Sequence, residues 1–163
     1  MTEPSAMLHL VCGKIAAGKS TLVARLGAEP GTVVVSEDSL LARLYPGEQE
    51  TLADYARNSG RLYDAIAPLL VQMLQNGISL VLDFPANTPA QRARLRKLFE
   101  QAGCPHRLHF LDVPDDVCKA RLRQRNAAGL HEYTVSEEQF DQFTSHFVPP
   151  SGDEGFEVVR YDA

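Results

Sequence analysis

The chain has 163 residues, of which 44% are hydrophobic, and a formal net charge of -5. This length suits one hydrophobic core and is short for two self-supporting domains, so we expect a single domain over residues 1–163. The acidic balance argues against a protein that coats long nucleic acid, because that affinity comes mostly from Lys and Arg side chains that neutralise phosphates.

The sequence offers no segment suited to crossing a membrane. Its longest nearly apolar stretch covers residues 65–73 and contains Pro68, whereas a spanning helix needs roughly 20 residues. Residues 1–6 include Glu3 and no basic cluster, unlike a secretion signal. The three cysteines lack CxxC spacing, which favours reduced thiols over a disulfide or structural zinc. We therefore expect a cytoplasmic protein, with a monomer as the default.

Short apolar runs alternate with amphipathic segments of helical length along the chain. Runs without polar alternation, such as Val33-Val34-Val35 and Leu80-Val81-Leu82, are typical of strands buried on both faces of a parallel sheet. The pattern predicts an α/β fold with right-handed crossovers. The predicted strands are residues 8–12, 33–35, 79–82, 108–111 and 156–159.

A glycine-rich motif follows the first predicted strand directly. It reads Gly13-Lys14-Ile15-Ala16-Ala17-Gly18-Lys19-Ser20-Thr21, which fits G-x-x-x-x-G-K-[ST], and a helical run over residues 22–26 comes next. The glycines let backbone N–H groups point at phosphate oxygens, and the helix N-terminus adds its positive end. Lys19 would then contact the β- and γ-phosphates of ATP, and Ser20 would ligate Mg²⁺. The alternative is a glycine-rich turn with an exposed lysine, but the position between strand and helix favours a nucleotide-binding P-loop.

The second predicted strand leads into Ser36-Glu37-Asp38. In an open parallel sheet the carboxyl ends of neighbouring strands face the ligand crevice, so Asp38 is expected where an acceptor hydroxyl would meet the γ-phosphate. Its carboxylate could accept the hydroxyl proton as general base, although these three residues could equally cap the next helix. Arg43 could contact an anionic acceptor, or it could lie on a solvated helix face.

The third predicted strand ends in Leu80-Val81-Leu82-Asp83, a hydrophobic run followed by an aspartate. This form is typical of a Walker B element, in which the carboxylate holds the metal through water or steadies the substrate. An aspartate after a buried strand is also a common turn residue. Thr88 and Pro89 then predict the start of a helix over residues 90–102, which Gly103 ends.

Three arginines lie on a predicted helix over residues 117–126. Arg121 and Arg125 are one turn apart on one face, where they could contact polyphosphate or stack on adenine, while Arg123 is displaced from that face. An exposed basic face balanced by the acidic segment 136–141 is the alternative, and the P-loop favours the functional interpretation.

Several segments together resemble the small P-loop kinases of the polynucleotide-kinase, zeta-toxin and chloramphenicol-phosphotransferase group and their bacterial AAA-type ATP-binding relatives. The resemblance covers nearly the whole chain. The matching segments are residues 13–21, Ser36-Glu37-Asp38 with Arg43, Leu82-Asp83 through Asn87 to Gln91-Arg92, Leu111-Asp112-Val113-Pro114, and the lid-like residues 120–126.

This resemblance implies a kinase-type P-loop NTPase fold, a three-layer sandwich around a five-stranded parallel sheet. It also implies that Asp38 is the catalytic base and that Arg121 and Arg125 belong to a lid of approximately residues 121–135. The acceptor pocket is implied to lie between Asp38, Asp83 and the helical segment 52–75.

The chain differs in two features from the proteins that it resembles, and these differences narrow the range of expected functions. The segment Asp83-Phe84-Pro85-Ala86-Asn87 lacks the Asp-x-x-Asn spacing of nucleic-acid 5'-kinases, and no arginine-finger region of ring-forming AAA machines is recognisable. We therefore expect a kinase that transfers the γ-phosphoryl group of ATP to a small-molecule hydroxyl. A nucleic-acid 5'-end or nucleotide-sugar kinase, and a non-catalytic ATP-dependent switch, are the alternatives.

Overall fold

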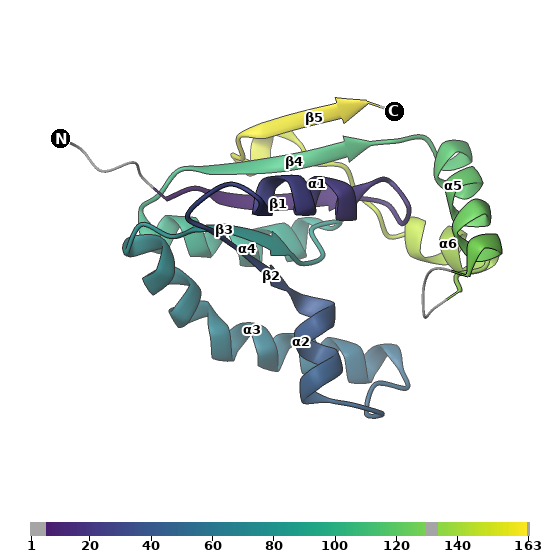
Figure 1. Cartoon of the computed structure of the whole chain (residues 1–163), viewed down its shortest axis with the longest axis horizontal. Helices are drawn as coiled ribbons and strands as arrows, with labels where there is room; N and C mark the ends of the chain where they lie inside the picture. The colour runs from purple at the N-terminus through teal and green to yellow at the C-terminus, as the bar shows by residue number, and fades with distance from the viewer. Residues whose placement is uncertain (1–5, 130–133, 163) are drawn as a thin grey trace.

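The protein is described by a computed structural model that covers residues 6–129 and 134–162. Strands and helices alternate along most of the chain (Figure 1). The strands are β1 (Leu8–Gly13), β2 (Thr32–Ser36), β3 (Ser79–Asp83), β4 (His106–Asp112) and β5 (Val158–Asp162). The helices are α1 (Lys19–Gly27), α2 (Glu37–Leu44), α3 (Leu52–Gln75), α4 (Pro89–Ala102), α5 (Asp115–Ala128) and α6 (Glu137–Thr144), and a 3₁₀ turn covers Gly152–Glu154.

The five strands form one parallel sheet in the order β2-β3-β1-β4-β5. Because β1 lies in the centre, the chain that leaves it at Gly13 enters the crevice at the carboxyl end of the sheet. This arrangement confirms the predicted α/β fold with a five-stranded parallel sheet.

Helices cover both faces of the sheet, and each face has its own hydrophobic core (Figure 1). Alternate residues of β1 point to opposite faces of the sheet and so belong to different cores. Leu10 packs with α3 and α4, whereas Val11 packs with α1, α5 and α6. Leu95 of α4 and Leu122 of α5 represent the two helical layers, and each is 1% exposed. The molecule is therefore a three-layer sandwich.

The structure corrects the expectation for residues 33–35. We predicted a strand buried on both faces, but β2 is an edge strand, and Val33 and Val34 are each 41% exposed. An apolar triplet indicates a strand without indicating how many neighbours cover it.

The last strand also differs from its prediction, since β5 begins at Val158 instead of residue 156. Phe156 lies in the connection before β5, where its ring packs edge-on against Phe99 and His106. Phe156 therefore packs in the hydrophobic core near α4 and is not part of the strand.

The helix boundaries predicted around α4 are confirmed. The Thr88 hydroxyl accepts a hydrogen bond from the Gln91 N–H at 3.2 Å, Pro89 is the first helical residue, and Gly103 ends the helix with a φ of 65°. The helix predicted over residues 117–126 begins earlier, at Asp115. Across residues 6–129 and 134–162, none of the helices combines the length and apolar character that a membrane crossing requires.

Candidate active site

The P-loop connects β1 to α1 with an unusual backbone. Ala16 and Gly18 both have positive φ values, 63° and 105°, which bend the chain around the N-terminus of α1. A side chain at Gly13 would lie only 3.3 Å from the Cβ atoms of Ala17 and Leu111, so the loop closes tightly onto β4. The motif residues thus form the compact turn that their spacing predicts.

Lys19 lies across this turn instead of extending into solvent. Its Nζ atom donates to the carbonyl oxygens of Gly13 at 2.6 Å and Lys14 at 2.8 Å. Burial lowers the pKa of Lys19, and the negative charge of Asp83 opposes that shift. Lys19 is therefore a half-buried cation held over the loop.

The concave face of the loop suits a polyphosphate. Within the described residues, the N–H groups of Ile15, Ala16 and Gly18 have no hydrogen-bond acceptor. They border a cavity of about 380 Å³ that Lys19, Arg121 and Arg125 also line. Unpaired donors and three cations around one cavity match the chemistry of a bound anion.

Arg121 and Arg125 reach this cavity from α5, one turn apart as their spacing predicts. The Arg121 Nη1 group donates to the carbonyl oxygen of Ala17 at 3.2 Å. Arg123 instead pairs with Glu137 of α6 on the exposed face of the helix. The predicted lid includes residues 130–133, which lie outside the described residues.

A second, smaller cavity of about 130 Å³ lies beside Lys19 and brings three charged side chains together. Asp38, Asp83 and Lys19 all line it. Burial and the nearby Asp38 charge raise the pKa of Asp83, whereas Lys19 lowers it. These residues come from α2, β3 and α1, whose ends meet at the carboxyl edge of the sheet.

The start of α2 is fixed by two contacts, of which the sequence offered the helix cap as an alternative and gave no sign of the second. Ser36 is the helix cap, because its hydroxyl accepts a hydrogen bond from the Ser39 N–H at 3.3 Å. Glu37 is only 1% exposed and accepts hydrogen bonds from the Tyr55 and Ser59 hydroxyls of α3. Burial raises the pKa of Glu37, and both hydroxyl donors oppose the shift. Glu37 thus ties α2 to α3, while its neighbour Asp38 lines the cavity at Lys19.

Asn87 connects the P-loop to the chain after β3. Its side-chain Oδ1 atom accepts a hydrogen bond from the Gly13 N–H at 3.0 Å, and its own N–H donates to Gln91 Oε1 at 3.0 Å. Its carbonyl oxygen accepts from the Val148 N–H at 2.9 Å. In the sequence, the segment from Asn87 to Gln91 is part of the resemblance to small P-loop kinases, but the sequence alone assigned Asn87 no role.

The buried side chain of Arg92 also holds the segment after β3 in place. Its side chain is 0% exposed and donates to both carboxylate oxygens of Glu154, at 2.7 Å from Nε to Oε2 and 2.7 Å from Nη2 to Oε1. It also donates to the carbonyl oxygens of Ala86 at 3.0 Å and Pro149 at 3.3 Å. Arg92 therefore holds the segment after Asp83 against the C-terminal part of the chain.

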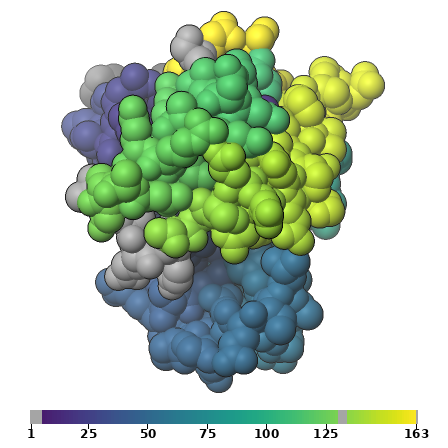
Figure 2. Space-filling view, turned by 90° about the vertical axis from the view of Figure 1, so that its right-hand side faces the viewer, coloured from purple at the N-terminus to yellow at the C-terminus, as the bar shows by residue number. Residues whose placement is uncertain are grey.

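A third cavity, of about 930 Å³, lies between α2 and the start of α3, and Asp38 lines it as well. Figure 2 views the molecule from this side, with α5 and α6 in green to yellow-green above and the α2–α3 region in blue below. Arg43 is exposed in the last turn of α2 and lines neither this cavity nor the one at Lys19. Asp38 is thus shared by a small cavity next to the P-loop and a large one beyond it.

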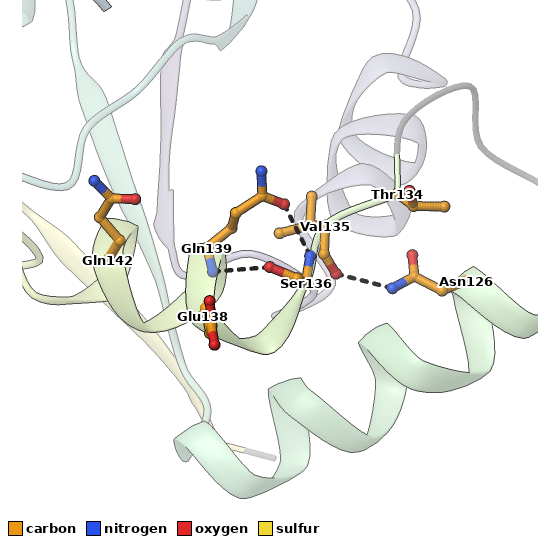
Figure 3. A pocket seen from close by; sticks show the side chains of 7 residues that line it. All are labelled: Asn126, Thr134, Val135, Ser136, Glu138, Gln139 and Gln142. Atoms are coloured by element: carbon orange, nitrogen blue, oxygen red, sulfur yellow. Dashed lines mark hydrogen bonds between the residues drawn. The ribbon is translucent and has the colours of Figure 1, made fainter.

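A fourth cavity, of about 610 Å³, lies between α5 and α6 (Figure 3). Asn126 donates to the Val135 carbonyl oxygen at 2.8 Å across it, and Ser136 and Gln139 form the capping box of α6. No P-loop residue and no aspartate lines this cavity. The cavities that Lys19 lines, which contain the P-loop residues and both aspartates, are therefore the candidate active site.

Sequence comparison assigns the chain to a family. A profile of the AAA domain family matches residues 8–150. The chain belongs to this AAA domain family. No curated protein sequence matches it significantly.

Several solved structures similar to this AAA domain are described as kinases. A candidate kinase from Chloroflexus aurantiacus is 20% identical, with a TM-score of 0.71 and coverage of 98% of this chain and 89% of that one. A sugar kinase from Janibacter sp. is 18% identical, with a TM-score of 0.66 and coverage of 98% and 86%. The APS kinase of Mycobacterium tuberculosis, in complex with AMPPNP and APS, is 21% identical, with a TM-score of 0.62 and coverage of 98% and 90%. At this identity the likeness establishes a P-loop kinase-like fold.

Proposed function

We propose that the protein is an ATP-dependent kinase that transfers the γ-phosphoryl group to a hydroxyl of a small molecule. The observation that carries this proposal is the placement of Asp38 between two cavities. One contains Lys19 and Asp83 beside the P-loop, and the other is large enough for an acceptor. A general base at such a junction would face the acceptor hydroxyl on one side and the γ-phosphate on the other.

In this reaction Asp38 accepts the proton of the acceptor hydroxyl. The hydroxyl oxygen forms a bond to the γ-phosphorus, the bond from that phosphorus to the bridging β,γ-oxygen breaks, and ADP leaves. Lys19 and the P-loop N–H groups hold the phosphates in line for this displacement. Arg121 and Arg125 neutralise the negative charge that gathers on the transferred group. Catalysis consists mainly of positioning and electrostatic stabilisation.

Ser20 and Asp83 are the residues that would hold Mg²⁺. A hydroxyl and a carboxylate are oxygen ligands of the type this ion prefers, and Ser20 lines the P-loop cavity while Asp83 lies next to Lys19. When bound, the ion would neutralise the phosphate oxygens. Burial and the charge of Asp38 raise the pKa of Asp83, and a bound cation would favour its ionised form.

The test follows ligand binding and turnover separately. Thermal unfolding is measured with Mg²⁺ and ATP, ADP or GTP, since a ligand that binds only the folded state raises the midpoint. ADP release is then followed with a panel of alcohols, sugars, nucleosides and antibiotics. Stabilisation by ATP together with acceptor-dependent ADP release supports the kinase. Stabilisation without turnover for any acceptor would favour a nucleotide switch, and no stabilisation by any nucleotide would refute ATP binding.

A further inference from the structure

The cavity between α2 and α3 has an uneven distribution of charge. Asp38 and Glu50 line it, and none of the lining residues in the described part of the chain is a lysine, arginine or histidine. Arg43, the cation nearest in sequence on α2, is not part of its wall. An acceptor in this cavity would therefore meet the carboxylates of Asp38 and Glu50 directly, whereas the positive charge of Arg94 acts on Tyr55 from outside the lining residues.

The wall also presents oxygen atoms that can accept hydrogen bonds from a ligand. The Gln49 Oε1 atom is buried and has no hydrogen-bond partner among the described residues. The Tyr55 hydroxyl donates its hydrogen to Glu37, so toward the cavity its oxygen can only accept. With the carboxylates of Asp38 and Glu50, these oxygens require a ligand that supplies hydrogens.

Several backbone donors of the same wall are already occupied. The N–H groups of Glu50 and Thr51 both donate to Asp54 Oδ2, each at 3.2 Å. The N–H of Glu48 donates to the carbonyl oxygen of Tyr45 at 3.1 Å. The hydroxyls of Ser39 and Tyr45 can still donate to a ligand, but a phosphate, sulfate or carboxylate on the acceptor would be repelled by the charges of Asp38 and Glu50.

We propose that the acceptor is a polyhydroxy compound, either uncharged or carrying an ammonium group, and that it bears no anionic group. Its hydroxyl or ammonium hydrogens would be donated to Gln49, Glu50 and Tyr55, which are specificity-determining residues. One hydroxyl is thereby directed to Asp38 at the junction with the cavity at Lys19. This inference rests on the proposed kinase function and names its class of substrate.

The first experiment does not require the acceptor to be known. A small-molecule extract of the source organism is separated at neutral pH on an anion exchanger, and each fraction is incubated with the protein, Mg²⁺ and γ-labelled ATP. We expect transfer of label to compounds of the unretained fraction, at least about tenfold faster than to the retained anions. Label on the retained fraction alone, or equal labelling of both, would overturn the acceptor class and leave the kinase intact. No labelled product from a protein that ATP stabilises would refute the kinase and this inference with it.

The second experiment reverses one charge of the wall. Glu50→Lys is compared with Glu48→Lys, an identical change at an exposed residue two positions earlier that does not line the cavity. With a hexose, its amino sugar and its phosphate ester as acceptors, Glu50→Lys should lower kcat/KM for the amino sugar relative to the phosphate ester by about tenfold. Glu48→Lys should leave that ratio unchanged. Both variants should keep the stabilisation by MgATP, because neither residue touches the P-loop cavity. Equal ratios in the two variants would contradict the assigned role of Glu50.

Discussion

Asp38 and Asp83 line one cavity because β2 and β3 run parallel with Ser36 directly opposite Asp83. The next residues of the chain then carry Asp38 into the first turn of α2, on the same edge of the sheet. The two carboxylates have different surroundings, since Asp83 ends a buried strand and its pKa is raised by burial and by the Asp38 charge. This division suits one carboxylate near a metal and another near an acceptor.

Asp38→Asn should abolish phosphoryl transfer while ATP binding remains. An amide keeps the size of the side chain but cannot accept the hydroxyl proton, so we expect kcat to fall by about 10²–10⁴. Single-turnover transfer and thermal stabilisation by MgATP are the two measurements. Asp64→Asn, an exposed residue of α3, is the matched control. Undiminished transfer in Asp38→Asn would remove Asp38 from the role of base.

Lys19→Ala should impair both binding and transfer. The Nζ atom bridges the carbonyl oxygens of Gly13 and Lys14, so its loss removes a cation from the phosphate cavity and a support from the loop. We expect the rise in unfolding midpoint with MgATP to be largely lost, whereas Lys97→Ala on the exposed side of α4 should retain it. Equal stabilisation of both variants would contradict phosphate binding by Lys19.

Arg121→Ala and Arg125→Ala should each slow transfer more than they weaken ATP binding. Both arginines line the P-loop cavity, and charge-neutralising arginines act mainly in the transition state. We expect kcat to fall by roughly 10³ for at least one of them. Arg123→Ala is the control on the same helix, because that residue pairs with Glu137 at the surface. A similar loss in all three variants would indicate damage to α5 instead of catalysis.

Stability should decrease on acidification because of a buried histidine pair. His109 accepts or donates hydrogen bonds with His9 at 2.9 Å and Tyr161 at 2.8 Å, and burial together with the charges of His9, Arg107 and Arg25 lowers its pKa to about 4. Between pH 6.5 and about 4, His109 is protonated in the unfolded chain but not in the folded chain. The free energy of unfolding therefore falls as pH falls.

His109 should contribute at most about 1.4 kcal/mol per pH unit to the slope of the free energy of unfolding against pH in that window. Above the window this contribution should vanish. Urea unfolding at several pH values measures it. His109→Gln should flatten the dependence, and His146→Gln, at an exposed position, should not. A dependence unchanged by His109→Gln would mean that other groups cause it.

Arg92→Met should destabilise the fold by about 3–5 kcal/mol, because it leaves the Glu154 carboxylate facing a buried site without its partner. The double variant Arg92→Met with Glu154→Met should recover part of that loss. Arg160→Ala is the comparison, since Arg160 pairs with Asp112 at the surface with 62% of its side chain exposed, and should cost less than about 1 kcal/mol. A loss for Arg92→Met as small as that for Arg160→Ala would show that the buried pair is not a structural clamp.

The parts of this molecule that could be predicted from sequence are those set by neighbouring residues. The P-loop spacing, the Thr88-Pro89 helix start and the apolar runs of β1 and β3 each depend on a few consecutive side chains. The exposure of Val33 could not be predicted, because it depends on which strand lies next to β2. The burial and hydrogen bonds of Glu37 could not be predicted for a similar reason. Its donors Tyr55 and Ser59 come close only because α3 packs against α2.

All the residues that line the cavity between α2 and α3 fall within residues 38–55, one continuous stretch of the chain. The P-loop side draws on more of the chain, because its residues come from the loop after β1, from the end of β3 and from α5, and Asp38 of α2 is shared by both sides. If the proposed function holds, the acceptor is selected by one short segment of the chain, whereas ATP is bound by residues from several elements. Exchange of that segment between relatives would be a compact route to new substrates, in evolution and in the laboratory, with the P-loop left untouched.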